Sequence, residues 1–118
     1  MLRRLRNART NGYFRLLHAT NGRLALSIVD NPASHIAVAV IELELPVMNG
    51  LNLIGRLTWK RPKPTKIIAT TFLEHEPLFE IARYMGADAI VRKALPAEAL
   101  IKTVRGLLPE VVDAQLST

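Results

Sequence analysis

The stretch Ile36-Ala-Val-Ala-Val-Ile41 decides the fold class of this chain. It is uncharged and rich in valine and isoleucine, which is typical of a strand that lies inside a parallel sheet with both faces buried. Two shorter stretches of the same kind follow it, Lys66–Thr71 and Ala89–Val91. The sequence therefore predicts a set of buried, parallel strands.

Helical patterns separate these strands. Apolar residues at helical spacing follow Asn49-Gly50, a second pattern of this kind begins after Pro77, and a third runs from Pro96 until Pro109 interrupts it. Strands that alternate with helices indicate an α/β protein. We expect an open, mostly parallel sheet with flanking helices.

The length of the chain bounds the number of domains. A chain of 118 residues has the length of a single domain. Within it we expect a basic N-terminal helix or arm over 1–11, a core over 12–108 and a tail over 109–118.

Composition excludes several classes of site. Apolar residues make up 49% and charged residues 22% of the chain, which is in the globular range. Cysteine is absent, so the chain has no disulfide, no thiolate metal ligand and no cysteine nucleophile. No apolar stretch is long enough to span a bilayer, so we expect a cytoplasmic protein without membrane contact.

The net charge of +6 is unevenly distributed, because residues 1–29 hold six arginines and no acid. A basic segment of this kind is compatible with nucleic-acid binding. It is equally compatible with a solvated basic face or with an acidic protein partner. We favour these two alternatives, because no aromatic interleaving accompanies the arginines.

Polar residues close each predicted strand. Glu42 and Glu44 follow the first strand, Thr71 ends the second, and Lys93 follows the third. In open α/β sheets, ligands bind at the carboxyl ends of the strands, so an acid, a hydroxyl and a lysine are expected to converge there. Alternation along the strand predicts that one of the two glutamates faces the pocket and the other faces solvent.

Five segments carry a family resemblance: Asn21–Leu26, Glu42–Gly50, Lys66–Phe72, Gly86–Asp88, and Arg92-Lys93 ahead of a Pro-Ala-Glu-Ala-Leu helix start. In order and spacing, over about residues 20–108, they resemble the receiver domain of bacterial two-component response regulators. Thr65–Arg105 is most similar to the receivers of LuxR-type DNA-binding regulators. The resemblance implies a flavodoxin-like or CheY-like fold and a role in phosphorelay signal transduction and transcription regulation.

The chain departs from the family at the phosphoacceptor. The family phosphorylates an aspartate, whereas the corresponding position here is Glu42, whose carboxylate is one methylene farther from the backbone than in-line phosphoryl transfer requires. The family also holds magnesium with two acids at the end of its first strand, and no acid precedes Asp30 in this chain. We therefore expect neither a metal nor another cofactor. The three histidines, His18, His35 and His75, are too scattered to suggest a metal site.

The switch residues match only in part. The resemblance assigns Thr71 to the switch hydroxyl and Lys93 to the lysine of the pocket, so that Lys93 would pair with Glu42. The pair is either a plain ion pair, which we favour, or an imitation of the activated state. Ile90 stands where the family has a rotating aromatic residue, and Ala94 stands where it often has a cis-proline, so the usual signalling route is not expected.

The family's first strand has no counterpart in the sequence, so the fold is expected to be abbreviated at its N-terminus. The resemblance implies that the chain opens in the family's first helix, over the arginine-rich segment Leu2–Ala8, and continues with a strand over Tyr13–Ala19 and a helix over Asn21–Asp30. Receivers order their strands 2-1-3-4-5, and the loss of strand 1 leaves a gap beside Ile36–Ile41. We expect Tyr13–Ala19 to move inward and pair with Ile36–Ile41 in a four-stranded sheet. The alternative is that a second chain fills the gap.

These observations predict a pseudo-receiver that is not an enzyme. It would act through a protein partner or self-association, without phosphotransfer, and would reach DNA only through a separate output domain. The alternative is a phosphorylation-competent receiver, completed by missing or borrowed elements, that controls a DNA-binding output domain.

Overall fold

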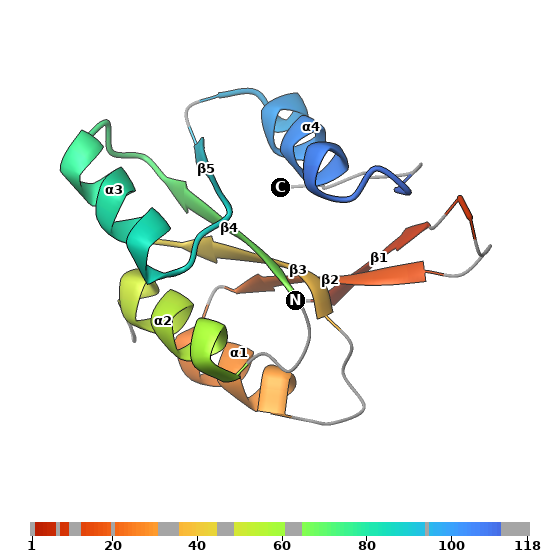
Figure 1. The fold of residues 1–118 in the computed structure, drawn as a ribbon, viewed down its shortest axis with the longest axis horizontal. Helices are drawn as coiled ribbons and strands as arrows, with labels where there is room; N and C mark the ends of the chain where they lie inside the picture. Colours follow the sequence, from red (N-terminus) through yellow and green to blue (C-terminus); the bar gives the residue numbers. More distant parts are fainter. Residues whose placement is uncertain are drawn as a thin grey trace.

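The computed structural model describes residues 2–6, 8–9, 13–19, 21–30, 36–44, 49–60, 65–93 and 95–111 (Figure 1). The predictions for His35, for Ala94 and for the last part of the C-terminal tail lie outside the described residues. Within the described part of the chain, no helix combines the length and the apolar character needed to cross a membrane.

The centre of the fold is a five-stranded sheet with the order β1-β2-β3-β4-β5. Its members are β1 (Leu2–Arg6), β2 (Tyr13–Ala19), β3 (Ile36–Glu42), β4 (Lys66–Thr71) and β5 (Ala89–Arg92). The pairs from β2 to β5 are parallel, and only β1 is antiparallel to its neighbour. The predicted direct pairing of β2 with β3 is confirmed, with no segment between them.

The prediction of a helix over Leu2–Ala8 is wrong, and the sheet has five strands where we expected four. Leu2 and Leu5 are three residues apart, which fits a helix, but the arginines on either side of Leu5 fit a strand equally well. The strand is the better solution, because all five residues of β1 pair with residues 13–17 of β2. That pairing satisfies backbone groups that a helix would leave exposed.

In the described part of the chain, four helices cover the sheet: α1 (Gly22–Asp30), α2 (Gly50–Lys60), α3 (Glu76–Met85) and α4 (Ala97–Leu107). Helices α1, α2 and α3 pack on one face, and α4 packs on the other (Figure 1). Along β3, Ala39 and Ile41 contribute to the core under the first three helices, whereas Val38 and Val40 contribute to the core under α4. The prediction that this strand is buried on both faces is therefore confirmed.

The start of α2 is held directly against the end of β3. Asn49 Oδ1 accepts a hydrogen bond of 2.8 Å from the Leu51 amide, which caps the helix. A side chain at position 50 would place its Cβ only 2.2 Å from the carbonyl oxygen of Glu42. Gly50 is therefore required by the close approach of two backbones, and this approach fixes the position of Glu42.

Candidate functional site

The carboxyl ends of three parallel strands bring the predicted site residues to one edge of the sheet. The register pairs Glu42 of β3 with Thr70 of β4, and Thr71 of β4 with Arg92 of β5. The Lys93 amide donates a hydrogen bond of 2.8 Å to the Thr71 carbonyl oxygen. Residues far apart in the sequence therefore become neighbours at this edge, as expected for an α/β sheet.

Glu42 and Lys93 form an ion pair at this edge. Lys93 Nζ lies 2.5 Å from Glu42 Oε1, and the two side chains are 27% and 24% exposed, respectively. The ammonium also lies 4.6 Å from the centroid of the Phe72 ring, which adds a cation–π contact. Since both charges are largely withdrawn from water, each depends on the other for compensation.

Thr71 is engaged by the second glutamate instead of by Glu42. Its hydroxyl donates a 2.5 Å hydrogen bond to Glu44 Oε1 and accepts one of 3.0 Å from the Leu73 amide. The same Glu44 oxygen accepts a 3.2 Å hydrogen bond from the amide of Phe72. Thr71 is fully buried, so these contacts fix its hydroxyl firmly.

The prediction that one glutamate faces the pocket and the other faces solvent agrees with the exposure of Glu44, but it misses a contact that Glu44 makes at the pocket. Glu44 is exposed, yet its carboxylate reaches back to Thr71. Alternation holds only within a strand, and β3 ends at Glu42, with a turn over the next two residues. Sequence reasoning also missed Phe72, whose position directly after Thr71 was the only available signal.

The remaining predicted residue, Ile90, lies on β5 and is half-buried against the core under α1, α2 and α3. The neighbouring Arg92 forms an exposed ion pair with Glu74, with 2.5 Å between Arg92 Nη1 and Glu74 Oε1. Such an exposed pair contributes little to stability. Ile90 and Arg92 therefore border the site without joining its contacts.

The carboxylates of this edge do not fit a magnesium site. Magnesium needs near-octahedral oxygen ligands, of which proteins commonly supply carboxylates. Here Glu42 is committed to Lys93, and Glu44 is committed to Thr71 and to a backbone amide. Among the residues with described positions, no group of three or more His, Cys, Asp or Glu side chains could hold a metal ion.

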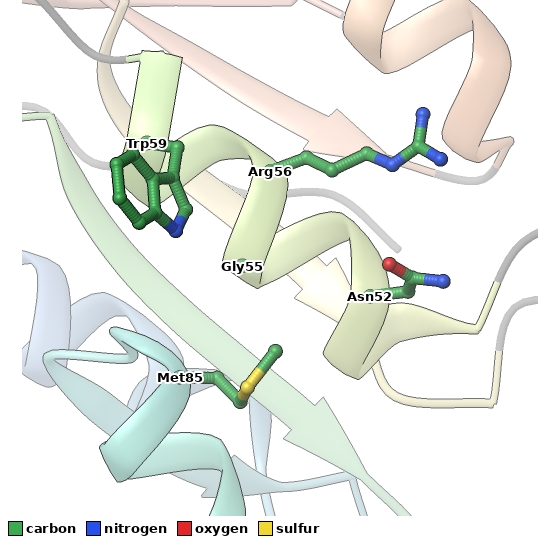
Figure 2. A pocket seen from close by; sticks show the side chains of 5 residues that line it. All are labelled: Asn52, Gly55, Arg56, Trp59 and Met85. Atoms are coloured by element: carbon green, nitrogen blue, oxygen red, sulfur yellow. The ribbon is translucent and has the colours of Figure 1, made fainter.

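A second surface feature lies between α2 and α3, away from this edge. It is a shallow pocket of about 350 Å³, and Figure 2 shows its lining residues, which are Asn52, Gly55, Arg56, Trp59 and Met85. The Met85 methyl group lies 2.6 Å from where a Cβ at position 55 would be, so the missing side chain of Gly55 makes room for it. Trp59 is 91% exposed. The residues that line the pocket include no acid and no nucleophile, so the pocket is suited to binding and not to catalysis.

Residues 1–105 match the family model of the response regulator receiver domain. The chain therefore belongs to the response regulator receiver family of two-component signalling systems. No curated protein was found to match the sequence.

Solved receivers share the fold. A CheY-like receiver domain protein from Methanospirillum hungatei JF-1 is 23% identical, with a TM-score of 0.68 over 76% of this chain and 70% of that one. The receiver domain of a putative Luxo repressor protein from Vibrio parahaemolyticus is 24% identical, with a TM-score of 0.69 over 79% and 69%. A LuxR-family DNA-binding response regulator from Staphylococcus aureus is 26% identical, with a TM-score of 0.65 over 74% and 70%. The predicted CheY-like α/β fold is thus confirmed.

Proposed function

We propose that this chain is a receiver-like signalling module that acts through contact with a protein partner or a second copy of itself, without phosphoryl transfer at Glu42. The observation that carries the proposal is the ion pair between Glu42 and Lys93. Phosphoryl transfer requires a carboxylate oxygen that is free to approach the phosphorus atom in line, with its charge balanced at the same moment. The longer glutamate side chain places its carboxylate on the ammonium instead.

The surroundings of the pair support the same function. The Thr71 hydroxyl, which the family uses as a switch, is held by Glu44. The two carboxylates at this edge are committed to other groups and leave no set of oxygens suited to magnesium. The proposal therefore includes the absence of enzymatic activity and of a cofactor.

Exposed aromatic residues support a role in contacts between proteins. Trp59 on α2 and Tyr84 on α3 are each 91% exposed, and Trp59 borders the pocket between these helices. Large exposed aromatic side chains are enriched where proteins bind one another. We assign partner contact to this surface.

The proposal extends to the form of the receiver and to the way in which it would affect transcription. The direct pairing of β2 with β3 supports an abbreviated receiver without the family's first strand. The relative from Staphylococcus aureus is described as DNA-binding and LuxR-type. By analogy we propose that any effect of this chain on transcription passes through a separate output domain, and that the chain works in the cytoplasm.

The test is the intact mass of the protein after incubation with acetyl phosphate and Mg²⁺. We expect no adduct on the native chain and none on Glu42→Asp, because the shorter carboxylate still has no magnesium ligands beside it. A phosphorylatable receiver treated in parallel shows that the reagent works. A phosphoryl group on native Glu42 would refute the proposal. An adduct on Glu42→Asp alone would show that only the length of the side chain prevents phosphorylation.

A further inference from the structure

The antiparallel pairing of β1 with β2 builds a basic surface at the open edge of the sheet. The register places Arg4 opposite Arg15 and Arg6 opposite Tyr13. Directly opposed residues of an antiparallel pair point to the same face, and so do residues two apart along one strand. These four side chains therefore share one face of the two-stranded ribbon.

This face is turned away from the core that lies under α4. Leu5 on β1 and Leu16 on β2 are 1% exposed and belong to that core. Arg4, Tyr13 and Arg15 alternate with them and are exposed, with Tyr13 at 61%. In Figure 1 the end of β1 and the start of β2 extend past α1 and α2, in agreement with the exposure of these three side chains.

The charges of Arg4 and Arg15 on this face are not balanced by an acid within the described residues. Arg4 and Arg15 stand directly opposite each other, and no described acid forms an ion pair with either. Like charges at opposed positions destabilise a sheet. Arg4 lies over the ring of Tyr13, with 4.8 Å between its Cζ and the ring centroid. An anionic ligand on this face would compensate both guanidinium groups.

We propose that the face formed by Arg4, Tyr13 and Arg15 binds single-stranded nucleic acid. Guanidinium groups form bidentate hydrogen bonds with phosphates, and an exposed ring beside them is a platform on which a base can stack. From the sequence alone, nucleic acid is the less favoured partner, because no aromatic residues are interleaved with the arginines. The register corrects this, because it brings Tyr13 onto the arginine face. This surface is separate from Glu42, so the inference is independent of the proposed function.

Two alternative roles of these arginines predict different behaviour. Charged side chains on an edge strand prevent sheets from joining edge to edge, and this role needs no ligand. An acidic protein segment could also neutralise the arginines, but it would make no use of a stacking ring. The exposed tyrosine therefore favours nucleic acid over an acidic peptide.

The experiment is fluorescence anisotropy with a labelled 20-nucleotide single strand, measured over a range of salt concentrations. Arg4→Gln/Arg15→Gln removes two of the proposed phosphate contacts, so the slope of log K against log salt should become shallower by about 1.4. The matched control, Arg83→Gln/Lys102→Gln, removes the same charge from exposed positions on α3 and α4 and should leave the slope unchanged. Thermal melts confirm that each variant is folded.

Substitutions of Tyr13 distinguish binding of nucleic acid from binding of other polyanions. Tyr13→Leu should weaken binding of the single strand by about 5-fold to 150-fold without changing the salt slope, and Tyr13→Phe should restore it. The inference is overturned if the native chain does not bind the strand at low salt, if both double variants lower the slope equally, or if Tyr13→Leu has no effect. It is also overturned if a duplex of the same length or polyglutamate of equal charge binds as tightly.

Discussion

Lys93 Nζ lies 2.5 Å from Glu42 Oε1, although the two residues are 51 positions apart in the sequence. The contact joins the end of β3 to the residue that follows β5, and so it spans the edge where the family performs its chemistry. A free carboxylate at this place would be available to a phosphodonor, but this one already has a cationic partner. The ion pair is therefore both a structural tie between strands and the main argument for the proposed function.

Replacing Glu42 with glutamine should destabilise the fold. The Lys93 ammonium would remain largely buried without a counter-charge, and we expect a loss of about 1–3 kcal/mol in the free energy of unfolding. Urea denaturation measures it. The control is Glu80→Gln, an exposed position in the interior of α3, which should change stability by less than about 0.5 kcal/mol. Equal effects of the two substitutions would show that the ion pair has no special role.

The two neighbouring threonines at the end of β4 should respond differently to valine. Thr71→Val removes a hydroxyl that donates to Glu44 and accepts from the Leu73 amide, so we expect a loss of about 1–2 kcal/mol. Thr70 is also buried, at 4% exposed, but its hydroxyl is 3.5 Å from the Ile41 carbonyl oxygen, which is a weak contact. Thr70→Val should therefore change stability by less than about 0.5 kcal/mol. A larger loss for Thr70→Val than for Thr71→Val would contradict the described hydrogen bonds.

Two glycines should give effects of opposite sign when replaced by alanine. In Gly50→Ala the new Cβ would lie 2.2 Å from a backbone carbonyl oxygen, so α2 or the end of β3 has to move, with a loss of about 1–3 kcal/mol or more. Gly106 lies in α4 with nothing within 4 Å of its Cβ position. Gly106→Ala should therefore stabilise the protein by up to about 1 kcal/mol, because alanine is the better helix former. Thermal and urea melts of both variants test this pair.

The central strands could be predicted from the sequence because they are buried on both faces. Val38 and Ala39 lie on opposite faces of β3 and are both fully buried, so an uninterrupted apolar run is the expected signal. The contact between Lys93 and Glu42 followed from the family resemblance and from the rule that parallel strands end at one edge. No pattern within a single segment could have shown it.

The errors arose where a local pattern has two solutions. The segment around Leu5 fits a helix or a strand, and pairing with β2 decides between them, which no local pattern contains. For Glu44, the alternation rule was extended past the end of β3 into a turn. Tyr13 and Arg4 are far apart in the sequence, so their contact could not be predicted from a local pattern. The contact results from the register between β1 and β2.

The assignment of Leu2–Arg6 to a strand can be tested with two leucines. Leu5 is 1% exposed on β1 and packs in the core under α4, so Leu5→Ala should cost about 2–5 kcal/mol. Leu24 on α1 is 55% exposed, and Leu24→Ala should change stability by less than about 0.5 kcal/mol. If the N-terminal segment were an undocked arm, both substitutions would be nearly neutral. Because Leu5 lies on β1 beside β2 and packs in the core under α4, we also expect Leu5→Ala to raise the rate of amide deuterium exchange along β2, while the rate along β5 changes less.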